Sequence, residues 1–188
     1  MSGWSLSEAG ALAQKAARGA GMPWGLAEEA GHAALWLEAR GAPGLAALAV
    51  RLEAGAEGRD APLCPVALGT RLIDGAEAPP EAARLAAPLL LAPFLATIAG
   101  GGAWRLAAGE AAMSVSSGAL ALSGGREALL AVDASCRMAP EDRAPAACPL
   151  RARVPESAAA AVARLGRFAA RTYAPATEAS RLAGAGAG

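Results

Sequence analysis

Four side chains that could support acid–base or binding chemistry recur at four-residue intervals in the segment 22–41. They are Trp24, Glu28, His32 and Trp36. Residues four apart lie on one stripe of a helix. There Glu28 could orient the His32 ring and raise its pKa, as a general base requires. His32 is therefore a candidate catalytic residue and Glu28 a candidate ligand-binding residue; the alternative is an ordinary surface pair beside a tryptophan.

A second set of candidates comes from alternation in a strand predicted over 128–138. Asp133, Ser135 and Arg137 share one face of this strand, opposite an apolar face that includes Cys136. Arg105, in a strand predicted over 104–110, is expected on the same polar side, as are residues 151 and 153. A guanidinium group binds two oxygens at once, so Arg105 and Arg137 are candidates for holding a carboxylate or phosphate. Asp133 is the candidate for moving a proton; the alternative is a solvated sheet face or one covered by a partner subunit.

Several well-known site patterns do not occur in the sequence. There is no phosphate-binding G-x-x-x-x-G-K-[ST] sequence and no G-x-S-x-G elbow, and the chain has one lysine, Lys15, against 16 arginines. The cysteines lack zinc-site spacing, and one histidine cannot supply a two- or three-imidazole site. We therefore expect no metal and no cofactor.

The spacing of apolar residues, which predicts the elements that position these candidates, changes near position 60 from that of helices to that of strands. Before it, the spacing of apolar residues predicts helices over 6–18, 22–41 and 45–52, the first with a capping box of Ser5 and Glu8. After a connector at 55–62, alternation or apolar runs predict strands, listed here in chain order: 63–74, 89–98, 104–110, 113–122, 128–138 and 150–154. A last helix is predicted over 156–172.

These elements predict an α+β fold. It comprises a three-helix segment (1–55), a mostly antiparallel sheet of five or six strands (63–154) and a C-terminal helix (155–172) packed on the sheet. Residues 173–188 are expected to form a flexible tail. The length of 188 residues suits a single domain over 1–188.

Composition limits the classes of partner and location. The formal net charge is zero, which argues against nucleic acid or a membrane surface as a partner. Three widely spaced cysteines and no secretory leader predict a cytoplasmic protein. The uncharged segment 85–104 has the length of a membrane span, but Pro88, Pro93 and three consecutive glycines make a buried strand pair, or a strand and a turn, the better interpretation.

Two stretches of the sequence, KAARGAGMPWGLAEEAG (Lys15–Gly31) and TYAPATEASRLAGAGAG (Thr172–Gly188), resemble an uncharacterised proteobacterial family, a domain of unknown function. The resemblance implies a small cytoplasmic metabolic or accessory protein of bacterial origin. It brings no established activity, so it assigns no catalytic residue.

Three functions are compatible with these observations. The first is a small-molecule-binding or accessory subunit that assembles with itself or with an operon partner through its tryptophan-bearing helices. The second is an enzyme that acts on a small carboxylated metabolite by acid–base chemistry. The third is a structural or regulatory protein.

Overall fold

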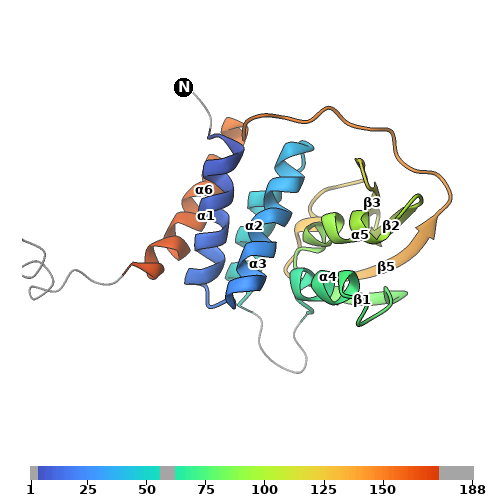
Figure 1. Ribbon diagram of the computed structural model, residues 1–188, viewed down its shortest axis with the longest axis horizontal. Helices are drawn as coiled ribbons and strands as arrows, with labels where there is room; N and C mark the ends of the chain where they lie inside the picture. Colours follow the sequence, from blue (N-terminus) through green and yellow to red (C-terminus); the bar gives the residue numbers. More distant parts are fainter. Residues whose placement is uncertain (1–3, 56–61, 174–188) are drawn as a thin grey trace, which may run out of the picture.

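The fold has a helical layer at one side and a single β-sheet at the other. The computed structural model describes residues 4–55 and 62–173. The predicted connector at 55–62 falls largely outside the described residues, and so does the predicted tail beyond Tyr173. Figure 1 shows the helices α1, α2, α3 and α6 at the left, the short helices α4 and α5 next to them, and the sheet at the right.

The three N-terminal helices are close to the predicted ranges. They are α1 (Leu6–Gly19), α2 (Trp24–Ala39) and α3 (Gly44–Ala54). The capping box of α1 is confirmed: Glu8 N donates to Ser5 Oγ at 3.2 Å, and Ser5 N donates to Glu8 Oε2 at 2.9 Å. After α2 the chain turns at Gly41, whose φ of 76° is a left-handed value that glycine adopts without strain.

The C-terminal helix lies on the helical layer, which corrects the prediction that it packs on the sheet. Helix α6 (Ala159–Ala169) is preceded by the 3-10 turn η3 (Glu156–Ala158) and followed by η4 (Ala170–Thr172). It packs against α1 and α3, with Leu165 and Phe168 buried. The end of α1 is so close to α6 that a Cβ on Gly19 would lie 1.9 Å from the Phe168 carbonyl oxygen. The sheet side of the helical layer is already covered by other apolar elements, so α6 buries its apolar face at the far side.

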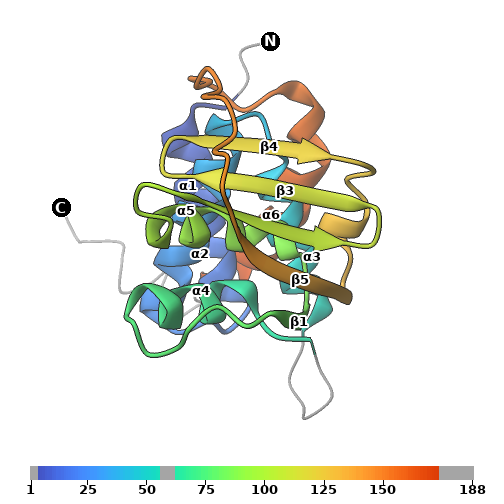
Figure 2. The same cartoon turned by 90° about the vertical axis from the view of Figure 1, so that its right-hand side faces the viewer.

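The sheet has five strands, all antiparallel to their neighbours, which confirms the α+β class. In the spatial order β1-β5-β2-β3-β4, they are β1 (Ala82–Leu85), β5 (Ala134–Glu141), β2 (Ala103–Ala108), β3 (Ala111–Ser116) and β4 (Ala119–Ser123). The inner face packs toward α5 (Ala92–Ile98) through side chains such as Leu106, Met113 and Val115, all 0% exposed. Figure 2 shows the outer face turned away from the helices.

The prediction of a strand over 63–74 is wrong, because this segment forms α4 (Pro65–Ile73). Its buried positions include Pro65, Leu68, Gly69 and Leu72, which have the spacing of one helix face. The apolar residues of this segment therefore fit a helix as well as they fit the alternation of a strand. Pro65 occupies the start of the helix, where its missing N–H costs nothing.

The prediction of a central strand over 89–98 is also wrong. The segment forms the 3-10 turn η1 (Pro88–Leu91) followed by α5, and most of its side chains are buried between the helical layer and the sheet. Burial on all sides produces a continuous apolar run in a helix as it does in a strand. Pro93, which counted against a strand, lies in the first turn of α5.

Three smaller corrections concern the remaining strands. The strand predicted over 113–122 is the hairpin of β3 and β4, which turns at residues 117–118. The strand predicted over 128–138 begins only at Ala134, after the 3-10 turn η2 (Ala128–Leu130). In the segment predicted as a strand over 150–154, Arg153 forms a single isolated bridge with Ser5, and β1 was not predicted.

Candidate functional site

The residues of the predicted helical stripe lie along α2, and the two candidates are exposed. His32 and Glu28 both face solvent, and Glu28 accepts a hydrogen bond from Gln14 Nε2 at 3.5 Å. Trp36 is half-buried, and the Arg40 guanidinium lies 3.8 Å from the centre of its ring. The stripe therefore exists as predicted, with two solvent-exposed polar groups at its middle.

The sheet candidates lie on the outer face or beside it. Arg105 and Arg137 occupy diagonal positions on the neighbouring strands β2 and β5, since Ala107 pairs with Arg137. Arg105 Nη1 lies 3.9 Å from Glu141 Oε1. Asp133, just before β5, forms an ion pair with Arg84 of β1. This hydrogen-bonded guanidinium lowers the Asp133 pKa, so the carboxylate is a weak base at neutral pH.

These two groups of candidates are separated by the thickness of the fold. His32 and Glu28 belong to the helical layer, whereas Arg105 and Arg137 lie on the sheet face that points away from that layer (Figure 2). Glu28 lines a shallow cavity of about 340 Å³ that His32 does not line. The single site that would combine His32, Asp133 and the sheet arginines is not assembled.

A different cavity combines an acid with arginines. This cavity, of about 380 Å³, lies between the end of α2, the beginning of α3 and the beginning of α6, and we call it the Glu38 pocket. The polar side chains that line it are Glu38, Arg126, Arg151, Ser157 and Arg164. They come from α2, the loop before η2, the segment before η3, η3 itself and α6, so residues distant in the sequence converge at one end of the helical layer.

Glu38 is the only glutamate or aspartate among the buried residues of the described chain, with 2% of its surface exposed. Its Oε1 accepts a hydrogen bond from the backbone N–H of Leu45 at 3.0 Å, in the first turn of α3. The close approach of the two helices makes this contact possible, because a Cβ on Gly44 would lie 2.2 Å from the Ala34 carbonyl oxygen. Burial raises the pKa of Glu38, while the hydrogen bond from Leu45 and the charge of Arg151 oppose this shift.

The three guanidinium groups of the pocket are held differently. Arg164 is committed to Glu53 of α3, with its Nε 2.9 Å and its Nη2 2.5 Å from the two carboxylate oxygens. Arg151 is anchored by its backbone, whose N–H donates to the Ala39 carbonyl at 2.7 Å. Its guanidinium lies over Gly41, where a Cβ would be 3.0 Å from Nη2.

Arg126 and Arg151 supply the positive charge that is available to a ligand. Among the described residues, neither forms an ion pair with a carboxylate. This position of Arg151 corrects the expectation that it lies on the outer face of the sheet with Arg105. The arrangement can bind an anion through two guanidinium groups and offer a buried carboxyl group to a hydrogen-bond donor.

No metal centre can be assigned from the part of the chain that the structure describes. Within residues 4–55 and 62–173, no group of three or more histidine, cysteine, aspartate or glutamate side chains could hold an ion. In the same ranges, no helix has the length and apolar character needed to cross a membrane.

Sequence reasoning missed Glu38 and Arg126, and it placed Arg151 on the sheet, for identifiable reasons. Glu38 occurs at the end of an apolar helix, where a glutamate is ordinarily solvated. One signal was present: Gly41, Pro43 and Gly44 force a tight turn, which brings the next helix start within reach of a carboxylate seven residues earlier. Arg126 and Arg151 lie outside regular helices and strands, where no periodicity indicates their direction.

The comparisons with known proteins bear on the N-terminal part of the chain. Neither the curated proteins nor the solved structures contain a match. Residues 4–79, which include α1 to α4 and the stretch Lys15–Gly31, match a family model described as "Protein of unknown function (DUF3726)". The stretch Thr172–Gly188 lies outside the match. The predicted resemblance to a domain of unknown function is thus confirmed, and residues 4–79 are similar to the DUF3726 family.

Proposed function

We propose that the protein binds a small anionic metabolite, a carboxylate or a phosphate ester, in the Glu38 pocket. The observation that carries this proposal is a carboxyl group with 2% exposure in the wall of a cavity that is bordered by three arginines. A buried ionisable group in a cleft, with a pKa moved by desolvation and by a specific neighbour, is typical of functional sites. A volume of about 380 Å³ is in the range of small-molecule sites.

The residues take distinct roles in this proposal. Arg126 and Arg151 hold the anionic group, since they have no carboxylate partner among the described residues. Glu38 accepts a hydrogen bond from a hydroxyl or amino group elsewhere on the ligand. Arg164 is a positioning residue, because its ion pair with Glu53 fixes α6 against α3 at the edge of the pocket.

A thermal-shift titration tests the proposal with succinate and inorganic phosphate as probes. A ligand present at 100 times its Kd stabilises the native state by about 2.7 kcal/mol. For a chain of this size, this corresponds to a rise in Tm of about 5–10 °C. Arg151→Gln should abolish the rise, and Arg126→Gln should reduce it.

The matched controls come from the sheet. Arg105→Gln and Arg137→Gln remove one arginine each from the outer face, so they should leave the rise in Tm unchanged. If these two variants abolish it and Arg151→Gln does not, the ligand binds on the sheet and the Glu38 pocket is the wrong site. If neither probe raises Tm, the proposal fails.

A second candidate function is an acid–base enzyme that acts on the bound anion. The raised pKa of Glu38 favours it, because a carboxyl group that titrates closer to neutrality transfers protons efficiently. His32 and Asp133 remain proposals for proton transfer. If a compound that binds is also turned over, three variants show which residue transfers the proton: Glu38→Gln, His32→Ala and Asp133→Asn. Full activity in all three variants rules out an acid–base enzyme.

Assembly with a second copy or with an operon partner in the cytoplasm belongs to the same proposal. Trp4 and Trp24 are 43% and 65% exposed, and aromatic side chains are enriched at interfaces. The three cysteines are unpaired, which fits a reducing compartment. Sedimentation at increasing protein concentration tests self-association, and a constant monomer mass excludes the homo-oligomer. If an oligomer forms through the surface around Trp4, at the start of α1, Trp4→Ala should weaken it.

A further inference from the structure

Another cavity lies at the other end of the helical layer. It measures about 530 Å³ and is lined by residues of α1, the first residue of α2 and η4; we call it the Lys15 pocket. Helix α2 runs from one pocket to the other, since Trp24 begins it and Glu38 is its penultimate residue. At 1.5 Å per residue, about 21 Å of helix separates the two. A ligand here would therefore be independent of one in the Glu38 pocket.

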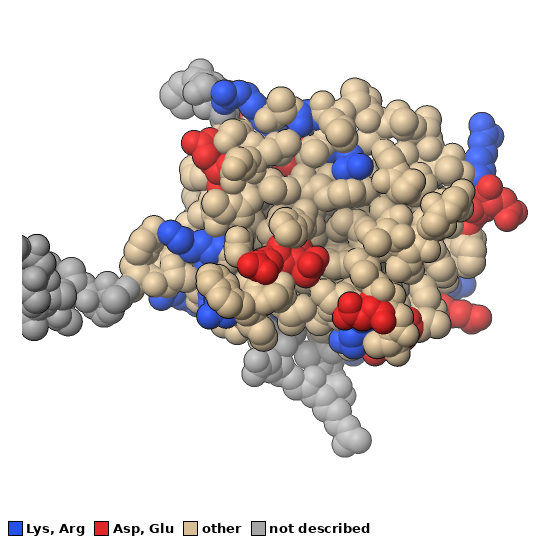
Figure 3. Space-filling view, viewed as in Figure 1, with Lys and Arg blue, Asp and Glu red and all other residues tan. Residues whose placement is uncertain are grey.

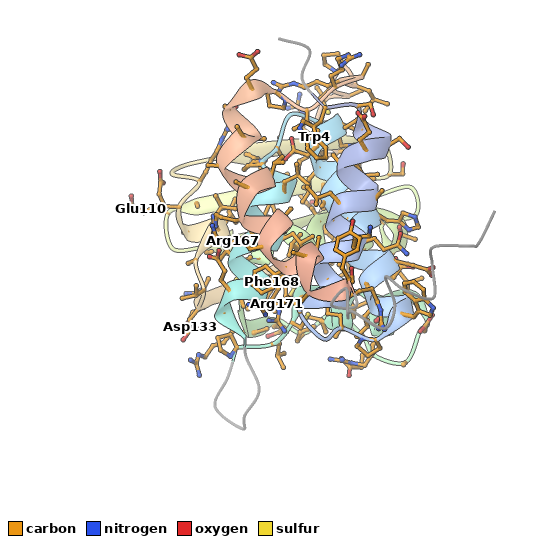
Figure 4. All side chains as sticks on the ribbon, turned by 90° about the vertical axis from the view of Figure 1, so that its left-hand side faces the viewer. Trp4, Glu110, Asp133, Arg167, Phe168 and Arg171 are labelled. Atoms are coloured by element: carbon orange, nitrogen blue, oxygen red, sulfur yellow. The ribbon has the colours of Figure 1, made fainter. Side chains whose placement is uncertain are left out.

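Three cations border the Lys15 pocket, and none of its nine lining residues is acidic. Lys15 and Arg18 come from adjacent turns of α1, and Arg171 comes from η4. Figure 3 shows blue side chains gathered at this end of the molecule, and Figure 4 shows Arg171 beside Phe168 at the end of α6. The pocket thus presents a positive potential in a protein of zero net charge.

The helix ends account for two of these cations but not for the third. Arg18 and Arg171 occupy the last turns of α1 and η4, where a cation interacts favourably with the helix dipole. Arg18 Nη1 also donates to the Met22 carbonyl at 2.5 Å, so its guanidinium is already committed. Lys15 lies a turn earlier, and it is the single lysine in a chain with 16 arginines. Its ammonium group is compact and donates through three rotatable N–H bonds, whereas the five donors of a guanidinium are fixed in one plane.

Exposed aromatic rings complete the pocket and its rim. Trp24 is 65% exposed, and the Arg18 guanidinium lies 4.8 Å from the centre of its ring. Tyr173 is also 65% exposed; Lys15 Nζ lies 2.9 Å from its hydroxyl oxygen and 4.5 Å from its ring centre. The Trp24 ring is held by a cation on one side while most of its surface stays in water, so a planar molecule can stack on it.

We propose that the Lys15 pocket is a second binding site, which takes a planar aromatic molecule carrying a carboxylate or phosphate group. The ring stacks on Trp24, and Lys15 and Arg171 bind the anionic group. Arg18 is a positioning residue that orients the Trp24 ring. Gly21, which lines the same pocket, has open space where a Cβ would lie, so it leaves room for the ligand beside the end of α1.

Calorimetric titration with two probes and their uncharged counterparts tests this site. The probes are adenosine 5′-monophosphate and 2-naphthoate; the counterparts are adenosine and 2-naphthol, and inorganic phosphate is titrated alone. At least one anionic probe should bind with a Kd below about 1 mM, and its uncharged counterpart should bind about tenfold more weakly. Binding of phosphate alone, which is expected in the Glu38 pocket, should be unchanged by Lys15→Met. The probe that binds distinguishes a nucleotide from an aromatic carboxylate.

Four variants locate the binding. Lys15→Met and Trp24→Ala should each weaken it by about five- to tenfold, since each removes one contact with the ligand. Lys15→Arg keeps the charge and should retain most of the affinity. Arg126→Gln changes only the Glu38 pocket and should have no effect. Both substituted side chains are exposed, so an unchanged Tm verifies folding.

Two results overturn this second site. One is the absence of saturable binding of either probe up to about 10 mM. The other is binding that persists unchanged in both Lys15→Met and Trp24→Ala. Neither result refutes binding in the Glu38 pocket, which is tested separately with succinate and with Arg151→Gln.

Discussion

Replacing Glu38 tests both the structure of the helical layer and the electrostatics of its pocket. In Glu38→Ala, the Leu45 N–H loses its acceptor inside the protein, where Leu45 is 0% exposed. Leaving a buried donor unpaired costs about 1–3 kcal/mol. Loss of the buried methylene adds about 0.8 kcal/mol. We therefore expect unfolding free energy to fall by about 2–4 kcal/mol, measured by urea denaturation, with a Tm lower by about 5–15 °C.

Glu38→Gln separates the hydrogen bond from the charge. The amide oxygen can still accept from Leu45, so the loss at about pH 5 should be under about 1 kcal/mol. The raised pKa means that the folded protein holds its proton more tightly than the unfolded chain. The contribution of protonated Glu38 to stability is therefore complete below the pKa of the unfolded chain, and it is lost as the pH rises through the pKa of the folded protein. The wild type should therefore lose stability relative to Glu38→Gln as the pH rises above the pKa of a glutamate in the unfolded chain.

Urea melts of the three proteins at several pH values decide the matter. If Glu38→Ala is as stable as the wild type, the carboxyl group does not hold the start of α3. If Glu38→Gln loses stability relative to the wild type as pH rises, the carboxylate is favoured in the folded state, and the assignment of a raised pKa is refuted.

Three further predictions concern other parts of the fold. Gly69→Ala should lower the unfolding free energy by about 1–3 kcal/mol, because its Cβ would lie 2.2 Å from the buried Phe94 ring. The control is Gly166→Ala in α6, where the new Cβ would have no atom within 4 Å, and it should raise the unfolding free energy by about 0.5–1 kcal/mol. Burial raises the pKa of Cys136 to about 11, so iodoacetamide at about pH 8 should alkylate the two half-buried cysteines well before this one, as mass spectrometry would show; rapid labelling would contradict its burial. Glu53→Gln should destabilise by less than about 1 kcal/mol at neutral pH, because the ion pair is partly exposed. The lowered pKa of Glu53 makes this difference disappear in acid, and a difference that grows in acid would be inconsistent with it.

The N-terminal helices were predictable because three independent signals agree there. The capping box at Ser5, the turn glycine Gly41 and the helical spacing of apolar residues all indicate the same boundaries. Residues 63–74 and 89–98 offered no such agreement. Alanine and leucine are acceptable in helices and in buried strands, so alternation alone could not distinguish α4 and α5 from strands.

The candidate site was harder to predict than the fold, because it is assembled by tertiary contacts. The sequence predicts an acid beside arginines, and assigns these roles to Arg105, Arg137 and Asp133. In the structure, the Glu38 pocket combines an acid with arginines, but these are other residues. Glu38 and Arg151 are more than a hundred positions apart, and no local pattern relates them. Lys15 was noted only as the single lysine of the chain, because composition does not show where its ammonium group lies.

The packing of α6 on α1 has a consequence for biosynthesis. Helix α1 packs against α2, which follows it directly, and against α6, which is synthesised more than 130 residues later. A nascent chain that ends near residue 79 contains the whole region similar to DUF3726, yet it leaves the α6-facing side of α1 open to water. Closing such a distant contact is slow, because much of the intervening chain must be ordered first. Ribosome-bound intermediates should therefore expose the α6-facing apolar side of α1 and be substrates for chaperones until α6 has been synthesised.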